Sequence, residues 1–116
     1  MIQIPEGLET AFELFLQELD GHLEFFGDLL SKLAAADEAA FRVLLSENER
    51  KISHKFHTVK GAAGFLQQKE LADQADQAER LFKSKVIFDL PRAEALQALQ
   101  RHVDELQQFR SAATNA

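Results

Sequence analysis

Apolar residues recur at every third or fourth position through the first third of the chain. This spacing places them on one face of a long α-helix. The stripe consists of Leu8, Phe12, Phe15, Leu19, Leu23, Phe26, Leu30 and Leu33. The segment AAADEAA at residues 34–40 follows and predicts a turn, in which Asp37 is the N-cap of the next helix.

A second stripe with the same spacing predicts another long helix, which ends near residue 66. Its members are Phe41, Leu45, Asn48, Ile52, Phe56, Val59, Ala63 and Leu66. Asn48 is the only polar member, so it either sets the packing register from a buried position or marks a kink. We favour one continuous helix.

Two shorter stripes complete the pattern. The third consists of Leu71, Ala75, Ala78 and Phe82, and the fourth of Leu96, Leu99, Val103 and Leu106. Pro91 suits the first turn of the last helix. Since no segment alternates like a strand, we predict an all-α, antiparallel up-down-up-down four-helix bundle. It forms a single domain over residues 1–116, and the first helical hairpin is long enough for part of it to project from the bundle.

The composition narrows the classes of function. The chain has 116 residues, no cysteine and a formal net charge of −6. Disulfides and thiolate metal sites are therefore excluded, and general binding to nucleic acid or to anionic membranes is disfavoured. The N-terminus lacks the pattern of a signal peptide, and no apolar run is long enough to span a bilayer. We expect a soluble, cytoplasmic protein.

The segment FHTVKGAAGFL at residues 56–66 departs from an ordinary buried helix because it contains two glycines, each costing roughly 1 kcal/mol relative to alanine. Phe56 belongs to the buried stripe, so His57, about 100° further round the helix, lies at an exposed or rim position. Helical side chains lean back over the preceding turn. Gly61 therefore leaves the imidazole uncovered, and Lys60 is aimed towards any group that His57 carries.

An exposed imidazole is largely neutral and nucleophilic at pH 7. The segment supplies no general base, no metal ligands and no nucleotide-binding loop, so the site is predicted to carry a group while other proteins do the chemistry. Residues 50–69 also contain five basic residues and no acidic one, which favours an anionic partner surface. The basic residues are Arg50, Lys51, Lys55, Lys60 and Lys69.

The segment HTVKGAAGFL resembles the signature of the histidine-phosphotransfer (HPt) domain, in which His is followed by Ser or Thr, any residue, Lys and Gly. Leu71, Ala75 and the pair Ala78 and Glu79 resemble the pattern of the next helix in that family. The upstream FELFLQEL resembles the first bundle helix. The resemblance covers roughly residues 8–110.

This resemblance implies a four-helix bundle that relays phosphoryl groups to or from receiver-domain aspartates, or accepts them from a sensor histidine kinase. It has no kinase activity of its own and no cofactor, because the Mg²⁺ belongs to the receiver. His57 is then the phospho-acceptor, Lys60 stabilises the phosphoryl group and Gly61 gives access to the imidazole. The family often has a glycine ten residues after the histidine, where this chain has Gln67. The segment before the histidine, residues 41–57, is longer than in many members.

Other residues near this motif are candidate contacts for the partner, namely His54, Lys55, Gly64 and Phe65. His54 is also a rival acceptor, but it lacks a lysine three residues later and a glycine four residues later. Phe65 either packs on the third helix, which we favour, or lies exposed as an apolar docking contact.

Other functions remain as alternatives. One is the N-terminal phospho-accepting module of a chemotaxis-type histidine kinase, and another is a helical adaptor bundle without chemistry. A metal site at His54 and His57 is disfavoured because the surrounding segment has no carboxylate. His22 and His102 are expected at surface or rim positions, and the protein is expected to act as a monomer.

Overall fold

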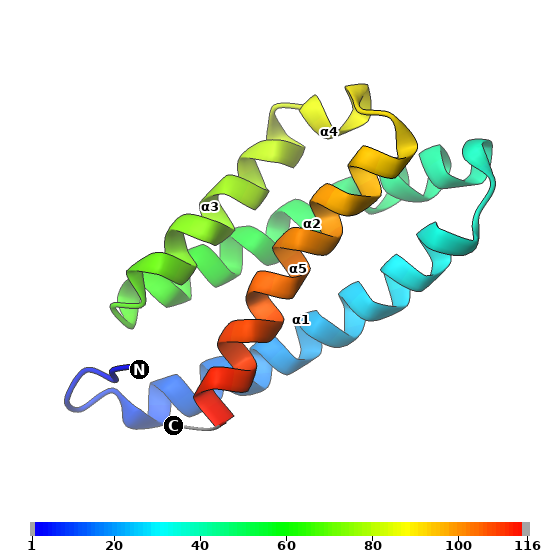
Figure 1. The fold of residues 1–116 in the computed structure, drawn as a ribbon. Coiled ribbons are helices and arrows are strands. Elements are labelled where there is room, and N and C mark those ends of the chain that lie inside the picture. The colour runs from blue at the N-terminus through cyan, green and yellow to red at the C-terminus, as the bar shows by residue number, and fades with distance from the viewer. Residues whose placement is uncertain (1, 115–116) are drawn as a thin grey trace.

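The computed structural model describes residues 2–114 of the chain. Its helices are α1 (Glu9–Ala35), α2 (Glu38–Phe65), α3 (Lys69–Lys83), α4 (Val86–Asp89) and α5 (Arg92–Thr114). The four long helices run alternately up and down, and α4 is a single short turn between α3 and α5 (Figure 1). No strand occurs in residues 2–114, so the prediction of an all-α bundle is confirmed. The bundle measures 49 × 24 × 20 Å.

The predicted apolar stripes form one core. Every apolar member of the second and third stripes is buried. In the other two stripes, Leu8, Leu23 and Leu96 are only partly covered. Phe26 of α1 and Phe56 of α2 stack in the centre, with 5.0 Å between their ring centroids. Burying a side chain of this size stabilises the fold by roughly 2–3 kcal/mol. These contacts fix the orientation of α2 at the residue that precedes His57.

Helix α2 begins as predicted and runs without a break. Asp37 is its N-cap, because the Asp37 Oδ1 atom accepts a hydrogen bond from the Ala40 backbone N–H at 2.8 Å. Asn48 lies half-buried on this helix, and its side-chain amide donates to the Leu44 carbonyl at 2.8 Å. The side chain thus finds a partner within its own helix, and the continuous helix is confirmed.

A residue in the left-handed backbone conformation follows the C-terminus of α2. Gln67 has φ 58°, and the two backbone hydrogen bonds of a Schellman motif surround it. They run from Gln68 N–H to the Ala63 carbonyl (2.8 Å) and from Gln67 N–H to the Gly64 carbonyl (3.2 Å). The backbone therefore adopts, at Gln67, the conformation that favours the glycine often found at this position in HPt domains.

Hydrogen bonds link the connection between α3 and α5 to the hairpin of α1 and α2, near the tip of that hairpin. Arg42 donates to the Leu90 carbonyl, and Arg92 donates to the Leu33 and Ala34 carbonyls, at 3.0–3.2 Å. The tip of the hairpin reaches past this connection in Figure 1. Within residues 2–114, no helix combines the length and apolarity that a bilayer span requires.

Candidate functional site

His57 lies on the outer side of α2, next to the buried Phe56, and 59% of its side chain is exposed. The prediction that this histidine faces solvent is therefore confirmed. A Cβ atom built on Gly61 or Gly64 would meet nothing within 4 Å. Packing within the described residues thus does not require glycine at either position. The effect of both glycines is that no side chain fills the space beside His57.

Glu79 on α3 contacts the imidazole. Its Oε2 atom lies 2.8 Å from the His57 Nδ1 atom, and only 3% of its side chain is exposed. The contact is an electrostatic one rather than an aligned hydrogen bond. Because the carboxylate is negatively charged, it favours the neutral tautomer of His57 that carries its proton on Nδ1. The Nε2 atom then holds the free lone pair. The geometry thus favours an imidazole whose Nε2 atom is the nucleophile at the surface.

Glu79 is absent from the predicted site residues, because the segment around His57 itself contains no carboxylate. The residue entered only through the resemblance of the pair Ala78 and Glu79 to the family pattern. One signal was available. Glu79 follows Ala78 and precedes Phe82 by three positions, so it lies on the buried face of α3, where an unpaired acid is costly. A partner from a neighbouring helix was therefore to be expected.

Two lysines surround the Glu79 carboxylate. Lys60 Nζ donates to Oε1 at 2.9 Å, and Lys83 Nζ lies 3.1 Å from Oε2. Neither the Lys83 nor the His57 contact with Oε2 is aligned as a hydrogen bond. Burial raises the pKa of the Glu79 carboxyl, but Lys60, Lys83 and the charge of His57 outweigh it and lower the pKa to about 2. Glu79 therefore remains ionised at neutral pH.

Lys60 is held between two acids of α3. Besides Glu79, it donates to Asp76 Oδ1 at 3.2 Å, and Asp76 in turn pairs with Arg80 at 3.0 Å. These contacts, with that to Glu79 foremost, raise the pKa of the Lys60 ammonium. Lys60 thus shares a carboxylate with His57, and direct contact of its ammonium with a phosphoryl group stays a prediction.

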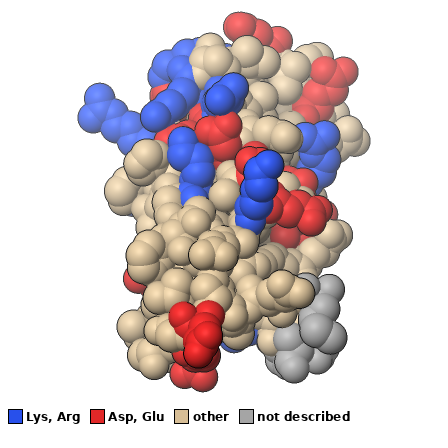
Figure 2. Space-filling view, turned by 90° about the vertical axis from the view of Figure 1, so that its left-hand side faces the viewer, with Lys and Arg blue, Asp and Glu red and all other residues tan. Residues whose placement is uncertain are grey.

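A shallow hollow of about 470 Å³ opens beside His57, between α2 and the end of α3; we call it the basic hollow. It is lined by Glu49, Arg50, Ser53, His54, His57, Glu79, Lys83 and Lys85. Figure 2 shows Lys and Arg side chains gathered around acidic ones in the upper part of the molecule, above a lower part with few charges. A mixed but cation-rich surface of this kind suits an anionic ligand group.

The predicted partner contacts separate into two groups. His54 and Gly64 are exposed on the same helix as His57, whereas Lys55 turns towards α1. The Lys55 Nζ atom lies 3.5 Å from His22 Nδ1 and 4.7 Å from the centre of the Phe25 ring. Lys55 is therefore a contact between helices, and any role in binding a partner is secondary to that.

Phe65 is 65% exposed, so the favoured expectation that it packs on the third helix is wrong. It lies in the last turn of α2, and the buried side of the helix end is filled by Ala63 and Leu66. An exposed aromatic ring beside two bare glycines matches the alternative of an apolar docking contact.

His102 is buried, which corrects its expected surface position. Only 4% of the residue is exposed, its Nδ1 atom lies 2.9 Å from Glu105 Oε1, and its ring packs edge-on against Phe56. The buried face of α5 is wider than the predicted stripe because His102 and Val103 both point inwards. Burial lowers the pKa of His102 despite Glu105. His22 is half-buried, as a rim position implies.

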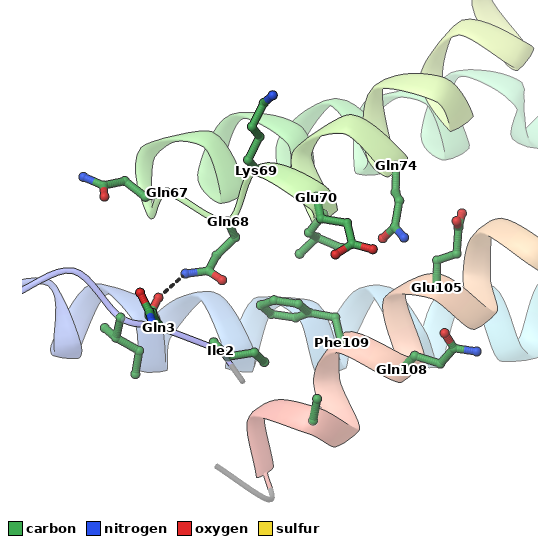
Figure 3. Close-up of a pocket in the computed structure, with 13 residues that line it drawn as sticks. Ile2, Gln3, Gln67, Gln68, Lys69, Glu70, Gln74, Glu105, Gln108 and Phe109 are labelled. Carbon is green, nitrogen blue, oxygen red and sulfur yellow. Dashed lines mark hydrogen bonds between the residues drawn. The ribbon is translucent and has the colours of Figure 1, made fainter.

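A larger hollow of about 950 Å³ lies at the end of the bundle where residues 2–4, the α2–α3 connection and the end of α5 meet (Figure 3). Gln68 Nε2 donates there to the Gln3 carbonyl at 2.7 Å. The described residues that line it include several glutamines but no histidine. Among residues 2–114, no group of three or more His, Asp or Glu side chains is placed to hold a metal ion.

Comparison with known proteins agrees with this site. The family model of the Hpt domain matches residues 10–115, which is most of the chain and includes every residue around His57 described above. No curated protein and no solved structure matched the chain.

Proposed function

The chain belongs to the Hpt domain family, and from this premise we propose that it carries phosphoryl groups on His57. Membership makes the chain a phosphotransfer module of two-component signalling. The observation that supports His57 as the acceptor is its exposed imidazole, whose Nδ1 atom lies 2.8 Å from the buried Glu79 carboxylate. His54 is also exposed but has no such carboxylate contact among the described residues.

The proposed transfer starts from the tautomer of His57 that carries its proton on Nδ1. The lone pair of His57 Nε2 attacks the phosphorus of a receiver phosphoaspartate, so an N–P bond forms as the P–O bond to the aspartate breaks. The electron pair of that bond leaves with the aspartate carboxylate. The imidazole keeps its proton on Nδ1 and becomes positively charged, and the adjacent Glu79 carboxylate stabilises this charge. The reverse step returns the phosphoryl group to an aspartate.

Lys60 contributes by holding the carboxylate. It donates to the Glu79 oxygen that does not face His57, and Asp76 anchors the lysine from the other side. Glu79 is thereby fixed on α3, so the imidazole is oriented before the partner arrives. This preorganisation removes a cost that would otherwise fall in the transition state.

The proposed partners are receiver domains and a sensor histidine kinase. The receiver supplies the acidic pocket and Mg²⁺, while this chain supplies the nucleophile and a cation-rich rim. We propose no kinase activity of its own, and we expect a monomer in the cytoplasm. A purely structural adaptor would leave the pairing of an exposed imidazole with a buried carboxylate without a purpose.

A transfer assay tests this function. A panel of receiver domains is charged with radiolabelled acetyl phosphate and mixed with the wild-type chain, with His57→Gln and with the control His54→Gln. We expect label on the wild type and on His54→Gln, and none on His57→Gln. Label of wild-type intensity on His57→Gln would exclude this histidine as the acceptor.

A further inference from the structure

The basic hollow lies on one side of His57, towards the N-terminus of α2. The α2 residues that line it, Glu49, Arg50, Ser53 and His54, all precede His57 in the chain. Helical side chains lean towards the N-terminus, so the imidazole extends over this side of α2. Lys60, almost one turn further on, does not line the hollow.

Lys83 is the lysine of α3 that borders both the hollow and the imidazole. Its ammonium and the His57 Nδ1 atom contact the same oxygen, Glu79 Oε2, at 3.1 and 2.8 Å. The two nitrogens are therefore close neighbours. The Lys83 side chain is 62% exposed, whereas that of Lys60 is 34% exposed and engages two carboxylates.

The surrounding charges allow Lys83 to change partners. Glu79 keeps its hydrogen bond from Lys60 if Lys83 turns away, so no buried charge is left alone. Lys85 is occupied by an ion pair with Glu49. Arg50, exposed at the α2 side of the hollow, has no ion-pair partner among residues 2–114.

We propose that the phosphoryl group on His57 lies in the basic hollow and that Lys83, rather than Lys60, contacts its oxygens. Lys83 exchanges Glu79 for the phosphoryl oxygens, and Arg50 adds a second cation from α2. Lys60 is then a positioning residue that holds Glu79 against the imidazole. No covalent step is added, because only ion pairs change. This assignment rests on the proposed function of His57.

The experiment uses the full chain, phosphorylated chemically with phosphoramidate, so it does not depend on finding a cognate receiver. The pKa of the phosphoryl group is measured by ³¹P NMR in the wild type, in Lys83→Gln and in Lys51→Gln. Lys51 is an exposed α2 lysine outside the hollow, so its variant is a control of equal charge change. Loss of a neighbouring cation disfavours the dianion, and we expect Lys83→Gln to raise this pKa by about 0.5 and Lys51→Gln to leave it unchanged.

A second measurement identifies the lysine without mutation. The side-chain ¹⁵N resonances of Lys60 and Lys83 are compared before and after phosphorylation. We expect the Lys83 resonance to move and that of Lys60, still bound to Glu79, to stay. An unchanged phosphoryl pKa in Lys83→Gln, or movement of the Lys60 resonance alone, would overturn the assignment. Absence of any phosphohistidine signal in the wild type would instead refute the proposed function.

Discussion

The Nδ1 atom of His57 on α2 lies 2.8 Å from the Oε2 atom of Glu79 on α3, and these two residues are 22 positions apart in the chain. The first is exposed and the second is buried. Bundle packing thus places a fixed negative charge beneath a solvent-facing nucleophile. The pairing accounts for the position of the ring, and the buried charge accounts for the cations that gather around Glu79.

Replacing Glu79 by glutamine removes the charge that stabilises the phosphorylated imidazole. We expect Glu79→Gln to slow phosphotransfer from a charged receiver about tenfold, because an interaction with a charged group contributes roughly 1.5 kcal/mol, which corresponds to a factor of about ten in rate. The measurement is the initial transfer rate. Glu94→Gln, at an exposed position of α5 that does not line the basic hollow, makes the same charge change and should transfer at the wild-type rate. Equal rates for both variants would contradict the role of Glu79.

Glu79 also links stability to acid pH. Its pKa is lowered from the ordinary 4.5 to about 2 in the folded chain. The folded state therefore releases this proton more readily than the unfolded state, and the stabilisation is fully present above pH 4.5. It is lost as the pH falls towards 2. Urea unfolding at several pH values should show that Glu79→Gln has a shallower loss of stability than the wild type in this window, and parallel curves would count against the assignment.

Gln67 occupies a left-handed conformation that glycine adopts without strain. We expect Gln67→Gly to raise the free energy of unfolding by about 1 kcal/mol. Gln97→Gly, at an exposed position inside α5, should lower it by about 1 kcal/mol, since glycine there only loosens a helix. Chemical denaturation measures the change in the free energy of unfolding of each variant. A loss of stability in both variants would disprove the explanation for position 67.

Phe65 is exposed, so its removal should affect binding rather than folding. We expect Phe65→Ala to change the free energy of unfolding by less than about 0.5 kcal/mol. Its transfer rate with a receiver should fall about threefold to tenfold, because an exposed aromatic side chain often anchors an interface. Leu14→Ala, at another exposed apolar position on α1, is the matched control for transfer. A large loss of stability together with normal transfer would contradict this role and indicate that Phe65 stabilises the fold instead.

The sequence predicted the parts of this structure that depend on local pattern. The spacing of three and four identified the long helices and the exposed position of His57, and the residue type of Asp37 in a turn identified it as a helix cap. The contact of His57 with Glu79 could not be predicted from the sequence because it joins two helices, and periodicity does not show which helix faces pack together. The same limit applies to His102 and Phe65, whose burial depends on how far the faces of α5 and α2 are covered. Helix α4 is a single turn of four residues, too short for a periodic signal.

Attachment of the phosphoryl group to a defined atom is tested most directly by NMR of the phosphorylated chain with ¹⁵N-labelled histidine. Coupling between ³¹P and ¹⁵N identifies both the residue and the ring nitrogen. A single phosphoramidate on Nε2 of His57 is the predicted result, because Glu79 occupies the Nδ1 side of the ring. Phosphorylation on Nδ1 of His57, or on His54, would contradict the account.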